Sequence, residues 1–257
     1  TSQISSLNGH IGSLQGGGQP PNTLIDQRTQ LITQLSQLVD VRTISTNDSS
    51  LTLTTSGGTA LVVGNQSFNL STQTNASTGF QDVYAQGSDI TSTIQSGNLA
   101  GDIQLRDQQL PAILTSVNTL AYDVANAVNT QSAAGFDLNG AEGGNFFTPP
   151  VSVSTAALNL SVAVTDPNKI AASADGTPGN NANATAMADL VSQPIVAGQN
   201  PTDYYSGIVS QVGNDASSAT TALTSQNLLV QQLQDQVGAV SRSEERRGGK
   251  ECIYRWA

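Results

Sequence analysis

Residues 20–39 read PPNTLIDQRTQLITQLSQLV, and the spacing of the apolar positions in this stretch decides the fold. The two prolines end any preceding helix, and Asn22 or Thr23 is expected to cap the next one. The apolar positions after that point follow helical steps of three, four and seven residues and form one stripe: Leu24, Leu31, Leu35, Leu38 and Val39. The stretch therefore predicts an amphipathic helix that needs a partner for its apolar face.

A partner helix is expected directly before it. The apolar residues Ile4, Leu7, Ile11 and Leu14 also recur at three- and four-residue steps. A run of three glycines, 16–18, separates this helix from the prolines. We expect residues 1–41 to form a helical rod segment, built as a hairpin of two helices.

The periodicity changes after Val41. Segments 51–54, 60–63 and 67–70 are rich in residues that favour strands, and Gly- and Asn-containing turns separate them. Residues 42–97 are therefore expected to form a β-rich insertion. A long helix follows over 98–131, and Pro111 inside it predicts a kink or a restart because proline lacks a backbone donor.

The second half of the chain is also expected to combine helices with strands and loops. Residues 132–200 are expected to form a mixed β and loop region, with one or two strands in 151–164 and a short helix over 184–191. The clearest helix is predicted for 201–241, where helical spacing is kept by Tyr204, Ile208, Val212, Ala216, Ala219, Leu223, Val230, Leu233, Val237 and Val240. Its other face is almost wholly Ser, Thr, Asn and Gln, so its stability has to come from coiled-coil-like packing on the earlier helices. The expected fold class is α+β: an elongated α-helical rod, packed as a coiled-coil-like bundle, with inserted β-rich domains.

Composition excludes most enzyme chemistry. Ser, Thr, Asn and Gln make up 100 of the 257 residues, whereas the chain has one His, one Cys and a net charge of −10. One His and one Cys cannot build a His-rich metal site, a zinc cluster or a disulfide within the chain. The acidic balance also argues against nucleic acid and anionic membranes as partners.

The last 16 residues differ from the rest. Residues 242–257 contain five of the nine cations and the only Cys and Trp, and without them the body has a charge of −12. A basic tail that binds a partner is one interpretation. Because Arg242-Ser243-Glu244-Glu245-Arg246-Arg247 closely resembles an in-frame translation of a common DNA-sequencing adapter, we instead interpret 242–257 as a sequencing artefact and exclude it from fold reasoning.

No catalytic, cofactor-binding or metal site is predicted, and no cofactor is expected. His10 has no second His or Cys nearby and is interpreted as a surface or packing residue. The segment 137–148 begins like a calcium loop, but Ala141, Glu142 and Thr148 stand where such a loop needs an oxygen ligand, a glycine and a bidentate glutamate. Asp102 and Asp107 flank Arg106 at a spacing that turns them to different sides of a helix, so we expect Arg106 and Asp107 to serve in capping or pairing between helices.

The same segments resemble a known family in the family's own order. The matching runs are Ser2–Asn8, Pro21–Leu31 with Gln34–Val39, Gly97–Asp107, Leu120–Asn129, Gly135–Gly140 with Phe146-Phe147, and Asn180–Ala184 with Ala188–Leu190. Together they are similar to the flagellar hook-associated protein of the hook–filament junction. One departure is Thr29, which stands where the family has an acidic residue.

The resemblance implies a structural role. It implies an extracellular subunit of the bacterial flagellum, exported by the flagellar type III system, that joins hook to filament by self-assembly. The implied partners are like subunits in a ring, the hook protein and neighbouring junction or filament proteins, with no nucleic acid and no membrane. Two alternatives stay open: flagellin or another flagellar axial protein, and a phage or surface glycan-active protein that uses an Asp pair such as Asp102 and Asp107.

Overall fold

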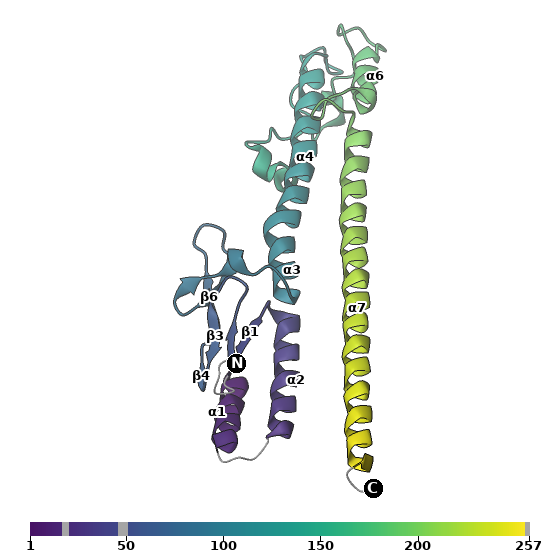
Figure 1. Ribbon diagram of the computed structural model, residues 1–257. Coiled ribbons are helices and arrows are strands. Elements are labelled where there is room, and N and C mark those ends of the chain that lie inside the picture. Colours follow the sequence, from purple (N-terminus) through teal and green to yellow (C-terminus); the bar gives the residue numbers. More distant parts are fainter. Residues whose placement is uncertain (17–20, 46–50, 255–257) are drawn as a thin grey trace. The chain divides into compact units, whose positions relative to one another are not determined.

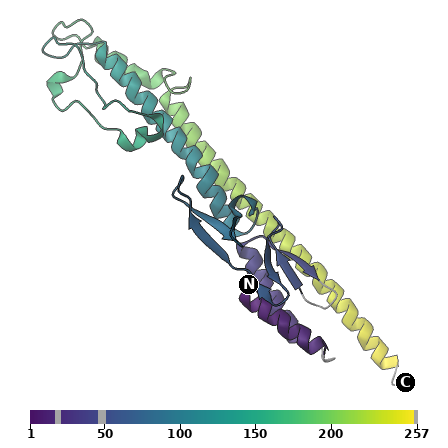
Figure 2. The ribbon, with the colours of Figure 1, turned by 90° about the vertical axis from the view of Figure 1, so that its left-hand side faces the viewer.

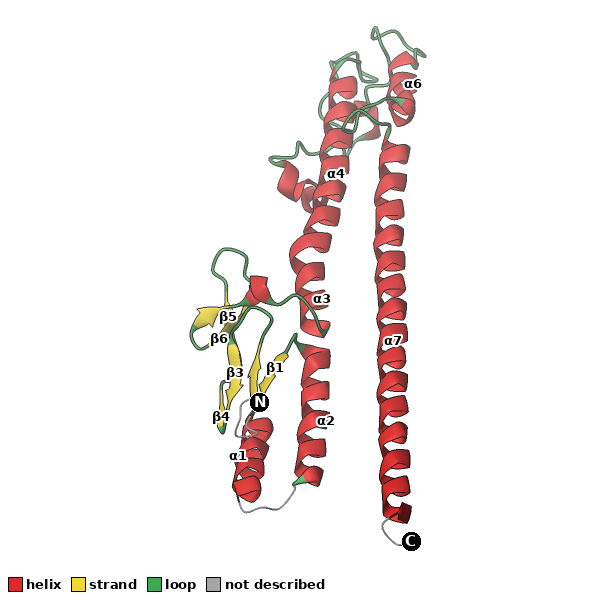
Figure 3. Ribbon diagram, viewed as in Figure 1, coloured by secondary structure: helices red, strands yellow, loops and turns green. Residues whose placement is uncertain are grey.

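The computed structural model describes residues 1–16, 21–45 and 51–254, with side chains described as far as Gln236. The chain divides into two compact units, Thr1–Ala112 and Ile113–Ala257. All strands of the described residues belong to the first unit, and the second is built of helices and loops (Figures 1 and 3).

The first unit combines a helical hairpin with two small antiparallel sheets. Its α-helices are α1 (Ser2–Gly16), α2 (Asn22–Leu38) and α3 (Asn98–Gln104). One sheet has the order β1-β2-β3-β4, with β1 Arg42–Ser45, β2 Leu51–Thr54, β3 Ala60–Val63 and β4 Gln66–Ser67. The other has the order β5-β6-β7, with β5 Leu70–Thr74, β6 Gln81–Ala85 and β7 Ser88–Asp89, followed by the short 3₁₀ turn η1 (Thr91–Thr93).

The strands predicted for 51–54 and 60–63 are β2 and β3. The strand predicted for 67–70 is wrong, since Gln66–Ser67 ends the first sheet and Leu70–Thr74 begins the second. The N-cap prediction for α2 is also wrong. Pro21 occupies the cap position, and no side chain bonds to the first turn there.

One apolar core holds the first unit together. It is formed by buried side chains from α1, both sheets and the segments that connect them to the helices: Ile4, Val39, Leu53, Leu61, Val62, Val83, Ala85, Ile90 and Ile94. Two residues of the α2 stripe, Leu31 and Leu35, pack against it together with the adjacent Ile32. Burying an aliphatic side chain of this size contributes about 1.5–3 kcal/mol. The predicted helical hairpin is therefore present, and part of its apolar face packs against the β-rich insertion, while Leu14 and Leu38 stay exposed.

The residues of the predicted long helix are helical, with a change of pitch among them. The α-helix α3 passes into a π-helical turn, η2 (Leu105–Gln109), and then into α4 (Leu110–Ala133). The amide of Leu110 donates to the carbonyl of Leu105, five residues back. Pro111 explains the turn, because proline cannot donate to the carbonyl of Asp107 and its ring crowds that carbonyl. The kink predicted at Pro111 thus takes the form of a π-turn just before it.

The second unit packs loops and short helices around α4 and one end of the last helix. The short elements are η3 (Val153–Thr155), α5 (Ala156–Asn159), η4 (Pro167–Lys169), α6 (Ala182–Asp189) and η5 (Leu190–Ser192). The last helix, α7 (Pro201–Tyr254), has 54 residues and begins alongside α4 in both views (Figures 1 and 2). The strands predicted in 151–164 are wrong: this segment forms η3 and α5, and a single bridge joins Phe147 to Val162.

The helix predicted for 201–241 is present, but its predicted packing is not confirmed. Many of its large apolar side chains are about half exposed, among them Val212 at 43%, Val209 at 53% and Leu223 at 63%. The backbone of α7 continues helically through 242–254, while side chains beyond Gln236 lie outside the described part. The interpretation of 242–257 as a sequencing artefact stays a prediction.

Candidate assembly site

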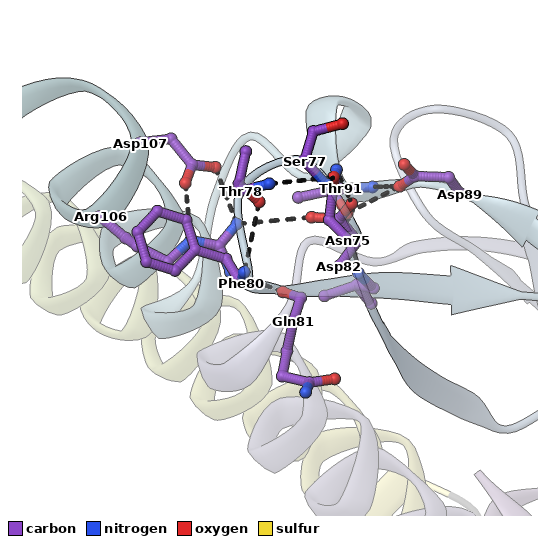
Figure 4. Close-up of polar contacts among 11 residues, drawn as sticks. Asn75, Ser77, Thr78, Phe80, Gln81, Asp82, Asp89, Thr91, Arg106 and Asp107 are labelled. Atoms are coloured by element: carbon purple, nitrogen blue, oxygen red, sulfur yellow. Dashed lines mark hydrogen bonds and ion pairs between the residues drawn. The ribbon is translucent and has the colours of Figure 1, made fainter. Parts of the chain in front are cut away.

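Arg106 binds the tip of the β5–β6 hairpin to the helix that follows it (Figure 4). Its Nη1 donates to the backbone carbonyl of Gln81 at 2.5 Å, and its guanidinium carbon lies 5.1 Å from the centre of the Phe80 ring. Its Nη2 is 3.8 Å from the Asp82 carboxylate. The one side chain therefore contacts three consecutive residues where β6 begins.

The same guanidinium is held by its neighbour in the helix. Arg106 Nε and Nη2 donate to the two carboxylate oxygens of Asp107 at 2.6 and 2.8 Å, a bidentate pair. This hydrogen bonding raises the pKa of Arg106 and lowers the pKa of Asp107. Both residues lie in the π-turn η2, so the turn fixes the direction in which Arg106 points.

The hairpin tip is ordered by its own polar side chains (Figure 4). Asn75 Oδ1 accepts from the amides of Ser77 and Thr78 at 2.9 and 3.3 Å, and Asn75 Nδ2 donates to Asp82 at 2.8 Å. At the other end of β6, Asp89 accepts from the amide and hydroxyl of Thr91, and the side-chain bond is the larger cause of its lowered pKa. The Asn75 hydrogen bonds hold the tip of the hairpin in one turn conformation.

A second polar cluster joins the helical hairpin to the first sheet. Asn8 of α1 donates to the carbonyls of Leu51 and Gly64 at 2.7 and 2.8 Å. Its Oδ1 accepts from Arg28 of α2 at 2.8 Å. Arg28 is only 8% exposed, and burial lowers the pKa of its guanidinium. Asn8 thus connects both helices to strand ends through backbone groups.

In the second unit, the buried face of α4 is polar and small instead of aliphatic. It consists of Asn118, Ala121, Ala125, Asn129 and Ser132. Asn129 donates to the carbonyl of Phe147 and accepts from its amide, at 3.0 and 2.8 Å. Asn118 in the same way donates to Ser154 O at 2.9 Å and accepts from Ala157 N at 3.0 Å. These side chains attach residues 147–157 to α4 by hydrogen bonds to backbone groups.

The apolar residues of α4 face a groove in the same unit. The groove has a volume of about 520 Å³, and α5 and the start of α7 also contribute to it. Its main lining residues are Val117, Leu120, Val124, Ala157, Leu160 and Tyr205. None of its lining residues is charged. The residues that the sequence predicts as the core face of α4 therefore line an open apolar surface.

Two aspartates of the second unit stabilise turns. Asp137 accepts from Lys169 Nζ at 3.0 Å and from the amides of Asn139 and Ala141, and the lysine bond is the largest cause of its lowered pKa. Asp175 accepts from the hydroxyl and amide of Thr177 and from Asn180, which lowers its pKa to about 2. The segment that begins like a calcium loop is thus a turn closed by a lysine.

The prediction that the chain has no catalytic, cofactor or metal site remains a prediction. Within the described residues, no group of three or more His, Cys, Asp and Glu is arranged to hold a metal ion. Of the alternative Asp pair, Asp107 is bonded to Arg106, and Asp102 is exposed on α3. The Phe146 and Phe147 rings lie edge to face at 5.2 Å, and Tyr205 is 57% exposed. Across the described part of the chain, no helix is long and apolar enough to cross a membrane.

Sequence reasoning missed two arrangements. It expected Arg106 and Asp107 to cap helices or pair them, whereas they bind each other and Arg106 reaches the β5–β6 hairpin. It also missed the buried Asn118 and Asn129 on α4. The available signal was their spacing of eleven residues, three helical turns, which places both on one face.

Comparison with known proteins identifies the class. Residues 1–147 match the family described as the flagellar hook-associated protein FlgK helical domain. The helical unit with its β-rich insertion is thus of the class of helical domains found in flagellar hook-associated proteins. The chain belongs to the FlgK family of flagellar hook-associated proteins.

Individual relatives agree with this. The chain is 25% identical to flagellar hook-associated protein 1 of Escherichia coli K12, over 93% of this chain and 61% of the relative. It is 30% identical to the protein of that name from Salmonella typhimurium, over 66% of this chain and 34% of the relative. The solved flagellar hook junction protein FlgK of Burkholderia pseudomallei has 31% identity and a TM-score of 0.51, over 57% of this chain and 28% of that one. The chain therefore spans between about a third and three fifths of the length of these two curated relatives.

Proposed function

We propose that this chain is part of a structural subunit of the bacterial flagellum, an adaptor that joins hook to filament by self-assembly. The observation that supports it most is the family match over residues 1–147, which includes the whole first unit and all of α4. That match favours a hook-associated protein over flagellin or another axial protein. The groove in the second unit adds a chemical reason, because an uncharged apolar surface suits contact with another protein.

The proposal includes the surroundings in which the subunit works. The protein is exported by the flagellar type III system and lies outside the cell. Its partners are like subunits in a ring, the hook protein and neighbouring junction or filament proteins. The net charge of −10 supports neither nucleic acid nor an anionic membrane as a partner.

We further propose that the helices act as a coiled-coil-like rod. The support comes from α7, where positions at alternating steps of four and three are mostly apolar or small: Tyr205, Val209, Val212, Ala216, Ala219, Leu223, Gln226, Val230 and Leu233. Small-angle X-ray scattering of the full-length protein should give the elongated pair-distance profile of a rod. A compact, nearly spherical profile would contradict this part of the proposal.

Gene deletion and complementation test the function. A strain that lacks the gene should form hooks but no attached filaments, and should release filament protein into the medium. The full-length gene should restore filaments, and so should the Asp102→Asn variant, because the adaptor role does not use this exposed carboxylate. Filaments that stay attached after deletion would overturn the proposal, and failure of Asp102→Asn alone would favour the glycan-active alternative.

A further inference from the structure

The segment 146–164 of the second unit has no charged residue and carries several exposed aliphatic side chains. We propose that it is a contact between subunits, which docks into the groove formed by α4, α5 and α7 on a second copy of this chain. The inference rests on the proposed function, since it identifies one contact through which copies assemble.

Several aliphatic side chains of this segment point into solvent. Val151 is 100% exposed, Leu158 is 85% exposed and Val162 is 56% exposed. Single exposed aliphatic residues are ordinary on protein surfaces, but several on one short segment mark an interaction surface. Ala157 and Leu160 of the same segment line the groove, whereas Val151, Leu158 and Val162 are not among its lining residues.

The segment is held in place before any partner arrives. Asn129 bonds both backbone groups of Phe147, and Asn118 bonds Ser154 and Ala157. Ser132 adds a bond to the carbonyl of Gly144 at 2.8 Å. A surface that is already ordered loses less conformational entropy on binding, and this favours association.

The groove is a chemical match for these side chains. At about 520 Å³ it has room for aliphatic side chains, and its lining is aliphatic apart from small residues, a proline and Tyr205. Tyr205, 57% exposed, lies at the start of α7, where a docked segment would cover it. Docking would thus bury apolar surface on both copies without leaving a charge unpaired.

Charge is the reason for choosing a second copy as the occupant. Outside residues 242–257 the chain has a charge of −12, so two copies repel each other over most surfaces. The exposed segment and the groove are both uncharged, so they are surfaces at which two copies can meet. A basic partner protein would find no carboxylate among the groove's lining residues. Because the two surfaces are different, a head-to-tail contact leaves one of each free on the outer copies, and such contacts generate rings and filaments.

Sedimentation of the purified chain tests the contact. The wild-type sedimentation coefficient should rise with protein concentration, and the double variant Val151→Asp, Leu158→Asp should lower the association constant by about tenfold or more. The matched control is Val191→Asp, which places the same charge at a residue that is 59% exposed outside the segment and should change association less than about twofold. Equal association of the double variant and wild type would overturn the proposal, as would the absence of association in the wild type.

Cysteine pairing tests which two surfaces meet. In a Cys252→Ser background, Leu158→Cys protein mixed with Tyr205→Cys protein should form a disulfide-linked dimer on mild oxidation. Either protein alone should form much less. Efficient self-linking of Leu158→Cys alone would point to a symmetric contact and overturn the inference.

The two proposals can fail separately. A full-length gene with Val151→Asp and Leu158→Asp that restores normal filaments would reject the contact and leave the adaptor role intact. Attached filaments in the deletion strain would reject the adaptor role, whatever the sedimentation result.

Discussion

The side-chain amide of Asn129 donates to the Phe147 carbonyl at 3.0 Å and accepts from the Phe147 amide at 2.8 Å. This pair of hydrogen bonds is the one that a residue in a neighbouring β-strand would make. The side chain of one helical residue thus takes the place of a neighbouring strand. Asn129 is only 7% exposed, so water cannot easily replace it as a partner. Loss of the side chain would leave two backbone groups without their partner.

Asn129→Ala is therefore expected to destabilise the second unit by about 2–3 kcal/mol, because unsatisfied buried polar groups cost more than the net gain of a bond. Hydrogen exchange of the Phe147 amide should become much faster, and the thermal midpoint should fall. The control is Asn126→Ala, in the same helix at a half-buried position, which should change stability by less than about 1 kcal/mol. Unchanged protection of Phe147 in Asn129→Ala would contradict the assignment.

Arg106→Gln should release the tip of the β5–β6 hairpin. The variant loses the bidentate bond to Asp107 and the contacts with Gln81 and Phe80, and since Arg106 is partly exposed we expect a loss of about 1 kcal/mol. The pKa of Asp107, which the Arg106 bond now lowers, should rise toward its ordinary value when followed by NMR. Arg106→Lys keeps the charge without the planar fork and should restore only part of the shift. An Asp107 pKa that does not move in Arg106→Gln would show that the pair does not form in solution.

Gly97→Ala should destabilise the first unit by about 3 kcal/mol or more. Gly97 precedes α3 with φ of +84°, and a Cβ there would lie 2.7 Å from the carbonyl carbon of Leu38. Gly101→Ala is the matched control: a Cβ at Gly101 meets nothing within 4 Å, and alanine in place of glycine favours a helix by about 1 kcal/mol. Denaturant unfolding should move the two variants in opposite directions. Stabilisation by both substitutions would mean that helix propensity, not the approach to Leu38, governs position 97.

Asp175 should make the stability of the second unit depend on pH in the acid range. Its pKa is lowered to about 2, chiefly by the hydrogen bonds of Thr177. A carboxyl whose pKa is lower in the folded than in the unfolded state contributes stability above the unfolded value, and that stability is lost as pH falls through the folded value. The difference in thermal midpoint between wild type and Asp175→Asn should therefore be constant near neutral pH and change between about pH 4 and about pH 2. A difference that stays constant down to pH 2 would contradict the lowered pKa.

The sequence predicts elements whose pattern is set by apolar burial. The α2 stripe, including Leu31 and Leu35, packs on a core as its spacing requires, and β2 and β3 begin and end at the predicted residues. The glycine-containing turn predicted between these two strands is also present, and Gly58 in it adopts φ of +87°. These elements depend on neighbours in sequence, and for that reason short-range pattern is enough to find them.

The polar attachments could not be predicted in the same way. On a helical wheel, polar residues such as Asn118 and Asn129 predict a face exposed to solvent. They are buried because residues 147–157 lie over them. The partner of Arg106 depends on the π-turn, and Pro111 signals that the helix is disturbed without specifying which way Arg106 turns. Both cases need the positions of groups distant in sequence, which the pattern of one segment does not contain.

The attachment of residues 144–157 to α4 has a consequence for how this protein can change. Asn118, Asn129 and Ser132 hold the segment by its carbonyl and amide groups, which every residue except proline provides in full. Substitutions on the outward side of the segment, at Val151 or Leu158 for example, leave those bonds in place. The residues that secure the segment are thus different from the residues on its outer surface, so that a change in what the segment contacts does not require a change in how it is anchored.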